Sequence, residues 1–452
     1  MCFDTFVTCK IEAPRKQYRP PQLSELLFLG VILLRRRRRL VVRLRGPPRP
    51  SLLLGHEWQL RNQENPGSLE MQWLYQYGNA YLIGGCFGQD VLMLSDPKAL
   101  QYIFHTSGYR FPKASDSDLS AKSLFGEGMV TVAAPAKNHK PSVLGFTAPS
   151  ISWVLSEYGT KGELDSSFGK PKLIVGSNER VVDILHWTKK IALDIIGINA
   201  TEGERGELGD ALHNVVIEAQ SSPSSIELLY PALWRIIPRF TSDILELIPL
   251  RVTRRFRRFK ASSHRVAQGI FQNQLRLAAQ DKEKDIVNLL DPKKRMSDDE
   301  IYSQLATFTF VGHDTTSNTI AWLLYEISCH PDVQLRIRHE ISKMRERDPS
   351  SSDYDSMPIL NAAIKAGDLH TLTCQRVSSK HDVLPLSEPI HLSDGSAVSE
   401  IPIPKGQVIL ASVYTYNRLP SVWGEDADKW NPDRFLQPQT HKETSLGVFA
   451  NL

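Results

Sequence analysis

The densest group of chemically capable side chains in this sequence follows a glycine inside an apolar stretch. After Gly312 come His313, Asp314, Thr315 and three further polar residues. Glycine weakens a helix by ~1 kcal/mol relative to alanine, and threonine or serine can bond to a preceding carbonyl and bend it. A locally opened helix carrying an Asp-Thr pair could hold water and pass protons to a bound ligand. Asp314 and Thr315 are therefore candidate proton-transfer residues. The alternative is a helix–helix contact lined by small polar side chains.

The element that must position this pair is a long helix. Residues 297–300 (Ser-Asp-Asp-Glu) form a capping-box signature, and His330-Pro331 is a stop signal. A helix between these limits would be about 50 Å long. The pair would then lie in its middle.

The surrounding sequence predicts a mainly α protein with a minor β portion. A glycine-rich turn between residues 80–83 and 91–95 predicts a hairpin, and Asp96-Pro97 predicts the start of a helix. Apolar periodicity predicts a helix over 181–198 and two or three helices over 225–279. We interpret the basic stretch 254–260 as a solvated helix face. Turn signals after residue 366 separate short strands, including 408–413.

Composition and charge exclude several classes of protein. With 41% hydrophobic and 23% charged residues, the 452-residue chain can bury a core and is not disordered. Five cysteines are too few and too scattered for a disulfide scaffold. The net charge of +4 hides an imbalance, because residues 1–50 hold 12 of the 54 Lys+Arg and 3 of the 50 Asp+Glu. The remaining body is slightly acidic, so we predict no nucleic-acid partner.

The N-terminal segment predicts contact with a membrane. The apolar run 26–34 is followed at once by five arginines, 35–39. A basic flank of this kind stays on the cytoplasmic side, although a spanning helix needs about 20 apolar residues. We predict a shortened anchor or interfacial helix within residues 1–45; the alternative is a disordered basic tail. Residues 46–50 form a proline-rich hinge, and residues 51–452 form a single domain.

The order of several motifs resembles the cytochrome P-450 family of heme-thiolate monooxygenases. Val311-Gly312-His313-Asp314-Thr315-Thr316 is similar to that family's central-helix signature. The resemblance extends over roughly residues 46–452, and the anchor suggests the eukaryotic, fungal branch. The other matching segments are the hinge 46–50, residues 77–100, 109–113, 192–197, 382–386 and 403–406, and the late loop 423–435.

The resemblance implies a cytochrome P-450 fold, bound heme b and oxidation of an apolar small molecule with molecular oxygen. Electrons would come from NADPH through a flavoprotein reductase, on the cytoplasmic face of the endoplasmic reticulum membrane. By motif position, Asp314 and Thr315 are catalytic, and Arg376 and His139 contact the heme propionates. We predict no metal-ligating residue within the chain.

Three departures from the family pattern bear on activity. The cysteine loop FxxGxRxCxG is absent, and residues 445–452 match the segment that leads into it. We therefore expect a fold that is incomplete at its C-terminus and a chain that is inactive as it stands. The Glu-x-x-Arg helix is replaced after Lys365, which predicts that Arg434 lacks its carboxylate partner. Pro141 replaces the basic cluster expected after His139.

Two alternatives remain for a chain without the thiolate. In the first, His313 or His139 ligates the iron, since imidazole is an established heme ligand. In the second, the protein is a cofactor-free pseudoenzyme that binds ligands at the membrane surface.

Overall fold

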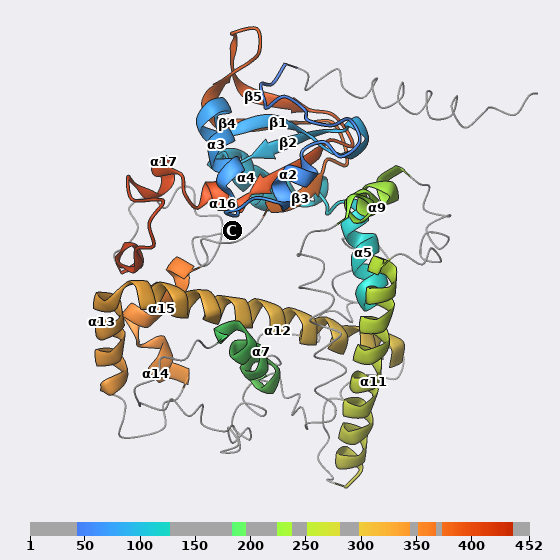
Figure 1. Ribbon diagram of the computed structural model, residues 1–452, viewed down its shortest axis with the longest axis vertical. Coiled ribbons are helices and arrows are strands. Elements are labelled where there is room, and N and C mark those ends of the chain that lie inside the picture. Colours follow the sequence, from blue (N-terminus) through green and yellow to red (C-terminus); the bar gives the residue numbers. More distant parts are fainter. Residues whose placement is uncertain are drawn as a thin grey trace, which may run out of the picture.

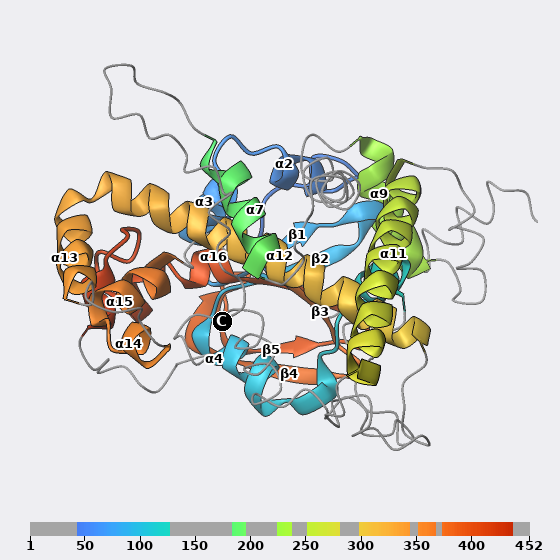
Figure 2. The ribbon, with the colours of Figure 1, turned by 90° about the horizontal axis from the view of Figure 1, so that it is seen from below.

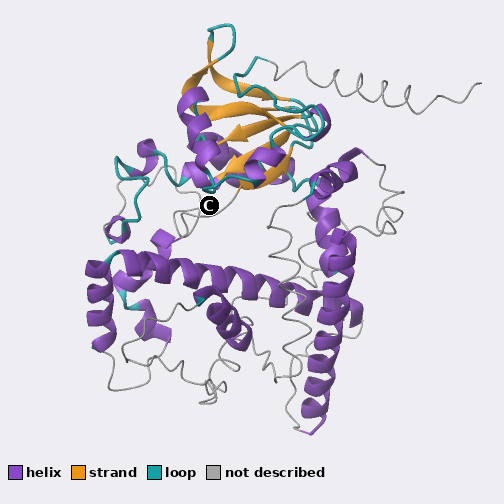
Figure 3. Ribbon diagram, in the orientation of Figure 1, coloured by secondary structure: helices purple, strands orange, loops and turns teal. Residues whose placement is uncertain are grey.

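The computed structural model describes residues 43–126, 183–195, 224–236, 251–280, 298–343, 351–367 and 373–436. His139 and the predicted anchor segment up to residue 42 lie outside these residues. Strands gather in one part of the molecule and long helices in the other, with α12 running across between them (Figures 1 and 3).

The larger sheet has four strands in the order β1-β2-β6-β3. β1 pairs antiparallel with β2, β2 parallel with β6, and β6 antiparallel with β3. β3 is therefore an edge strand. The strands alternate little in burial because both faces are covered, and Leu92 and Ile409 are fully buried between them. The bounds are β1 Ala80–Gly84, β2 Asp90–Leu94, β3 Thr373–Val377 and β6 Val408–Ser412.

The smaller sheet pairs β4 with β5 in antiparallel register. β4 spans Asp382–His391 and β5 spans Ala397–Ile403. Leu384 and Ile401 face each other in this ladder and belong to the same apolar core as Leu92 and Ile409. The two sheets are thus joined by one core.

Short helices connect and cover the sheets. Asp96 caps α4 by accepting a 2.9 Å hydrogen bond from the Ala99 amide, with Pro97 at the first helical position, as the sequence predicts. The short elements of this part are α2 Glu57–Arg61, α3 Ser68–Tyr77, η2 Cys86–Gly88, α4 Pro97–Gln101, the π-helical turn η3 Tyr102–Thr106, η4 Gly108–Arg110, α16 Val413–Tyr416, α17 Pro420–Trp423 and η8 Pro432–Phe435.

The helical part is organised around α12, Asp298–Cys329. α7 packs along one side of it, α11 crosses it near its N-terminal end, and α13 turns away at the other end (Figures 1 and 2). The remaining bounds are α5 Ser115–Phe125, α7 Ile184–Ile195, α9 Ser225–Ile236, α11 Arg251–Gln280, α13 Pro331–Ser342, α14 Ser351–Asp355 and α15 Pro358–Gly367.

Most predicted elements within the described residues are confirmed. The hairpin over 80–95, the long helix ending before His330 and the helices at 184–195, 225–236 and 251–280 are all present. Within the described residues, no helix is both long enough and apolar enough to cross a membrane.

Candidate functional site

The central helix passes through its polar segment without a break. Residues 312–318 are helical throughout, so the predicted local opening is wrong. The physical reason is that the hydroxyls bond to the preceding turn instead of opening it. Thr315 Oγ1 donates to the Val311 carbonyl at 2.6 Å, and Ser317 Oγ donates to the Asp314 carbonyl at 3.1 Å.

Thr315 lies on an exposed face of α12. Val311, one turn earlier, is 44% exposed, and Trp322, two turns later, is 42% exposed on the same side. Positions four and eleven residues apart share a helix face. An apolar strip with one hydroxyl on it is therefore left open along this side of the helix, among the residues that the structure describes.

His313 and Asp314 lie on the side of α12 that packs against α7. His313 is buried, and burial lowers its pKa to about 4, helped by the charge of Lys189 on α7. Burial raises the Asp314 carboxyl pKa, while Lys189 and a hydrogen bond from Asn318 oppose that rise. The three groups therefore share one electrostatic environment between the two helices.

Two buried atoms in this contact lack hydrogen-bond partners. They are Nδ1 of His313 and Oδ1 of Asp314. Such atoms are uncommon in buried positions and each costs about 1–3 kcal/mol. Since Asp314 keeps an acceptor free and has a raised pKa, it can exchange a proton with a neighbouring hydroxyl or water. The geometry thus leaves Asp314 with the properties of a proton donor.

Asp314 and Thr315 occupy adjacent faces of the helix. Successive residues turn by about 100°, so Asp314 stands between the buried side that carries His313 and the open side that carries Thr315. Asp314 therefore lies between the contact with α7 and the exposed strip, directly before Thr315 in the chain. His313, turned by about 160° from Thr315, is buried on the α7 side and does not fit the role of iron ligand on the open side.

Arg376 lies on edge strand β3. Its guanidinium stacks over the Phe104 ring at 5.0 Å, and its Nη1 donates to the Gln375 carbonyl at 2.8 Å. Among the described residues, none supplies Arg376 with an ion-pair carboxylate. A half-buried arginine in this state is well suited to bind an anionic group such as a carboxylate.

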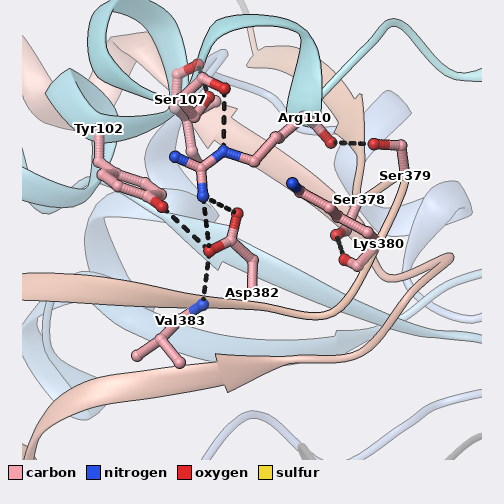
Figure 4. A network of polar contacts seen from close by, with 9 residues as sticks. Tyr102, Ser107, Arg110, Ser378, Ser379, Lys380, Asp382 and Val383 are labelled. Atoms are coloured by element: carbon pink, nitrogen blue, oxygen red, sulfur yellow. Dashed lines mark hydrogen bonds and ion pairs between the residues drawn. The ribbon is translucent and has the colours of Figure 1, made fainter.

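A polar network fixes the backbone next to Arg376 (Figure 4). Arg110 Nη1 donates to both carboxylate oxygens of Asp382, at 3.2 and 3.1 Å. The Tyr102 hydroxyl and the Val383 amide each donate to Asp382 Oδ1 at 2.9 Å. Ser379 donates to the Arg110 carbonyl through both its amide and its hydroxyl, each at 2.9 Å. The network ties residues 102–110 to the turn that follows β3.

Arg434 is not left without a carboxylate, and the expectation from the sequence is wrong here. Its Nη2 lies 3.1 Å from Asp426 Oδ1 and donates to the Asp426 carbonyl at 2.8 Å. Asn431 Nδ2 donates to the same carboxylate at 2.7 Å, which folds the late loop back on itself. The loop supplies the missing partner locally, although Nε of Arg434 stays without an acceptor.

Three cysteines lie within the described residues. Cys86 is buried, and its Sγ lies 3.8 and 3.9 Å from two backbone carbonyls. Cys374 is half-buried against the sheet core. Cys329 is exposed but 14 positions beyond Thr315, about 21 Å along the helix. Within the described residues, Cys86 and Cys374 thus contact backbone or core groups, and Cys329 is distant from Thr315 along the helix.

Several residues of the site are not apparent from sequence patterns. Lys189 is half-buried beside His313 and Asp314, but its only sequence signal is a pair of lysines in an amphipathic helix. The Arg110–Asp382 pair joins positions 272 apart. Arg110 and Asp382 each lie in a segment that resembles the family, 109–113 and 382–386, but neither segment indicates that the two residues pair.

This chain is similar to known proteins over most of its length. A family model described as cytochrome P-450 matches residues 45–449. Cytochrome P-450 monooxygenase claP of Ampulloclitocybe clavipes is 28% identical over 87% of this chain and 77% of its own length. Cytochrome P-450 monooxygenase 205 of Postia placenta is 27% identical over 90% of this chain and 79% of its own length.

Proposed function

Because the chain belongs to the cytochrome P-450 family of heme-dependent monooxygenases, we propose that α12 forms the proton-delivery wall of its heme site. The observation that carries the proposal is the placement of Thr315 on the open face, with the half-buried Asp314 one step behind it. Heme bound beside this face supplies the activation of molecular oxygen.

The roles of the two residues follow from their surroundings. Asp314 holds a proton more tightly than an ordinary aspartate because its carboxyl is partly buried. Thr315 Oγ1 donates to the Val311 carbonyl, so its lone pairs are free to accept a hydrogen bond from a ligand or water on the open face. Asp314 would thus store the proton, and Thr315 would orient the ligand or water that receives it on the open face.

Arg376 is the residue that would hold a heme propionate. Its guanidinium is supported by the Phe104 ring and has no competing carboxylate among the described residues. The Val377 amide donates to the Pro112 carbonyl at 3.0 Å, which fixes the strand beside it. His139, the second predicted propionate contact, lies outside the described residues, and its role stays a proposal from motif position.

None of the five cysteines, we further propose, ligates heme iron. The described ones are engaged elsewhere or too distant, and none has the family's loop sequence around it. A polypeptide of these 452 residues would then be inactive as a heme-thiolate enzyme. The second candidate function, a cofactor-free binding protein at the membrane surface, is favoured by the same observation.

The remaining proposals concern partners and location. The substrate is an apolar small molecule, in keeping with the exposed Val311 and Trp322 on the open face. The electron donor is a flavoprotein reductase that uses NADPH. Residues 1–45 attach the protein to the endoplasmic reticulum membrane with residues 51–452 on the cytoplasmic side, a proposal supported by the apolar run and the arginines after it.

Heme titration tests the assignment of the open face. Purified chain is titrated with hemin and followed by absorbance, with circular dichroism as the check on folding. Thr315→Trp should abolish saturable binding because the indole fills the open face, whereas Ser328→Trp, exposed near the end of the same helix, should bind as the parent does. Equal binding by both variants would remove α12 from the heme site.

Two further measurements separate the other roles. Arg376→Leu should weaken hemin binding by roughly tenfold, the effect of losing one charge-assisted contact, while the exposed Lys405→Leu should not. The reduced carbon monoxide complex should lack the thiolate-type absorption band. Appearance of that band would contradict the cysteine proposal and leave the assignment of α12 untouched.

A further inference from the structure

The outer edge of strand β1 is covered by residues 43–50 and by one buried side chain. The Leu82 amide donates to the Arg45 carbonyl at 2.9 Å. Two residues further along, the Gly84 amide donates to Nδ1 of His56 at 2.9 Å. β2 pairs with the other edge of β1, and alternate amides of a strand point toward the same edge. The segment and His56 therefore occupy an edge that would otherwise present unpaired backbone groups.

Residues 43–50 are attached to both sheets. At the start of the segment, Leu44 forms a bridge with Leu392, the residue that follows β4. At its end, Nη2 of Arg49 lies 2.5 Å from Oδ1 of Asp90, the first residue of β2. The part of this segment that the sequence suggests as a hinge thus lies between two fixed points on the folded body.

His56 joins the segment to β1 through both of its ring nitrogens, and it is only 1% exposed. Nδ1 faces the Gly84 amide, which can only donate, and Nε2 lies 3.2 Å from the Pro48 carbonyl, which can only accept. The Gly84 carbonyl, 3.3 Å from Nδ1, already accepts from the His56 amide at 2.8 Å. A neutral imidazole with its proton on Nε2 satisfies both contacts, whereas an imidazolium has no acceptor left for the Gly84 amide.

The surroundings of His56 favour this neutral form. Burial lowers its pKa and the charge of Arg49 lowers it further, while hydrogen bonds with the backbone of Gly84 and Pro48 oppose the change. The guanidinium of Arg49 is itself paired with Asp90, so that carboxylate is engaged away from the imidazole.

No acidic group of the neighbouring helices is paired with His56 among the residues that the structure describes. On α3, the Trp73 ring packs edge-on against the imidazole at 5.2 Å. The Glu70 carboxylate of that helix accepts from Nε2 of Gln63 at 2.9 Å instead. Glu57 follows His56 as the first residue of α2 and forms no ion pair with it. A positive charge on the imidazole would therefore have a guanidinium beside it and no carboxylate bonded to it.

We propose that residues 43–50 form a strap over the edge of β1 and that His56 is its latch, which opens when the imidazole is protonated. The added proton would lie on Nδ1, opposite the N–H of Gly84, so that two donors face each other. It would also create a buried charge without a partner. Release of the strap relieves both costs because the imidazole then reaches water. Heme, the cysteines and residues 1–42 do not enter this argument, and its failure would leave the proposed function intact.

The direction of the pH dependence follows from the two states of the strap. With the strap closed, the pKa of His56 is lowered from 6.5, and with the strap open it returns toward that value. The open state therefore binds more protons. The contribution of the latch to closure is complete above pH 6.5 and is lost as the pH falls toward the lowered pKa. Within this window, each pH unit multiplies the ratio of open to closed strap by up to about tenfold.

Hydrogen exchange of the full chain, followed by mass spectrometry, tests the latch. Protection factors remove the intrinsic effect of pH on exchange, and they are compared at about pH 7.5 and about pH 5.5 for peptides from β1 and β6. The parent chain is compared with His56→Gln, whose amide can accept from Gly84 and donate to Pro48 without titrating. The exposed His391→Gln serves as the matched control.

The expected difference is confined to β1. At the lower pH, the Leu82 and Gly84 amides should lose up to about tenfold more protection in the parent and in His391→Gln than in His56→Gln. The amides of β6 should respond alike in all three proteins, because other titrating groups act on the fold as a whole. If His56→Gln lost protection at β1 as the parent does, or if the parent lost none, the latch would be overturned.

A second variant tests the strap independently of the latch. A Cβ added at Gly46 would overlap the carbonyl oxygen of Leu82, so Gly46→Ala should leave the Leu82 amide poorly protected at both pH values. Gly367→Ala, which has open space around the added Cβ, should keep the protection of the parent. If Gly46→Ala also kept it, residues 43–50 would not cover the edge of β1 and the strap itself would be overturned.

Discussion

Two polar clusters of this molecule differ in how completely their buried polar atoms are hydrogen-bonded. Around Asp382, every carboxylate oxygen is hydrogen-bonded, by Arg110, Tyr102 and the Val383 amide. Between α12 and α7, His313 and Asp314 each keep a buried atom without a partner. Both clusters join segments distant in sequence, and both are at least partly buried. They differ in whether the protein satisfies its own polar groups.

The difference separates a structural role from a functional one. A fully paired network holds two segments together and has no capacity left for a ligand or a proton. An unpartnered buried acid costs stability, and folds tolerate such a cost mainly where function requires it. The Asp382 cluster is thus expected to stabilise the protein, and the Asp314 cluster to destabilise it slightly while keeping a proton available.

The largest effect is expected from Asp382→Ala. Its carboxylate is 9% exposed, and its removal leaves Arg110, Tyr102 and the Val383 amide without their acceptor. We expect the free energy of unfolding to fall by about 2–3 kcal/mol, somewhat less than for a fully buried pair because Arg110 reaches solvent. Urea unfolding monitored by circular dichroism measures this loss.

The matched control is the exposed pair Arg43–Asp394, whose side chains are 76% and 49% exposed at 3.9 Å. Arg43→Ala should change stability little, because water screens the pair and solvates the Asp394 carboxylate that remains, which keeps its hydrogen bonds from Ser396. If both alanine variants lost the same stability, the Asp382 network would have no special structural role.

The next largest effect is the pH dependence of the free energy of unfolding that the buried His313 causes. Its pKa is about 4 in the folded protein against 6.5 for the free side chain, so the unfolded chain binds more protons between these values. Stability from this group is complete above pH 6.5 and is lost as the pH falls toward 4. The loss is about 1–2 kcal/mol after allowance for partial solvent screening.

His313→Leu should remove that part of the pH dependence, and the exposed His391→Leu should retain it. Unfolding free energies of the variants measured between pH 4 and 7 give the comparison. A His313→Leu protein with the parent's slope would show that His313 is solvated and charged like any surface histidine.

A smaller effect of opposite sign is expected at Asp314. Its pKa is raised by burial, so the folded protein binds more protons and its stability falls as the pH rises through the carboxyl titration. Asp314→Asn should therefore be more stable than the parent at pH 7, by less than about 1 kcal/mol given its partial exposure. The gain should shrink as the pH is lowered, whereas a gain that is constant with pH would point to packing instead.

Sequence reasoning predicted the fold well where signals are local. The cap of α4, the end of α12 before His330-Pro331 and the hairpin of β1 and β2 depend on neighbouring residues, and these predictions are confirmed. The order of motifs also identified the family. Local patterns failed where the partner of a side chain depends on how a loop turns, as when Asp426, eight residues before Arg434, pairs with it.

The candidate site could be predicted only in part for the same reason. Asp314 and Thr315 stand side by side in a recognisable motif, but their division between a buried and an open face depends on where α7 packs. The unbroken course of α12 depends on whether a threonine hydroxyl bonds to its own helix or to water, and the sequence permits both. Lys189 acts across the helix contact and has no motif that would reveal it.

The smallest effect on stability is expected from Lys189→Met, which should mainly shift the pKa values of two neighbouring side chains. The lysine charge lowers the pKa of both His313 and Asp314, so its removal should raise both. Histidine-selective NMR titration would show the His313 pKa moving up toward 6.5, and Lys343→Met, which removes an exposed lysine just after α13, serves as the control. If neither variant moved the His313 titration, α7 would not be electrostatically coupled to the central helix, and the unpartnered atoms there would reflect burial alone.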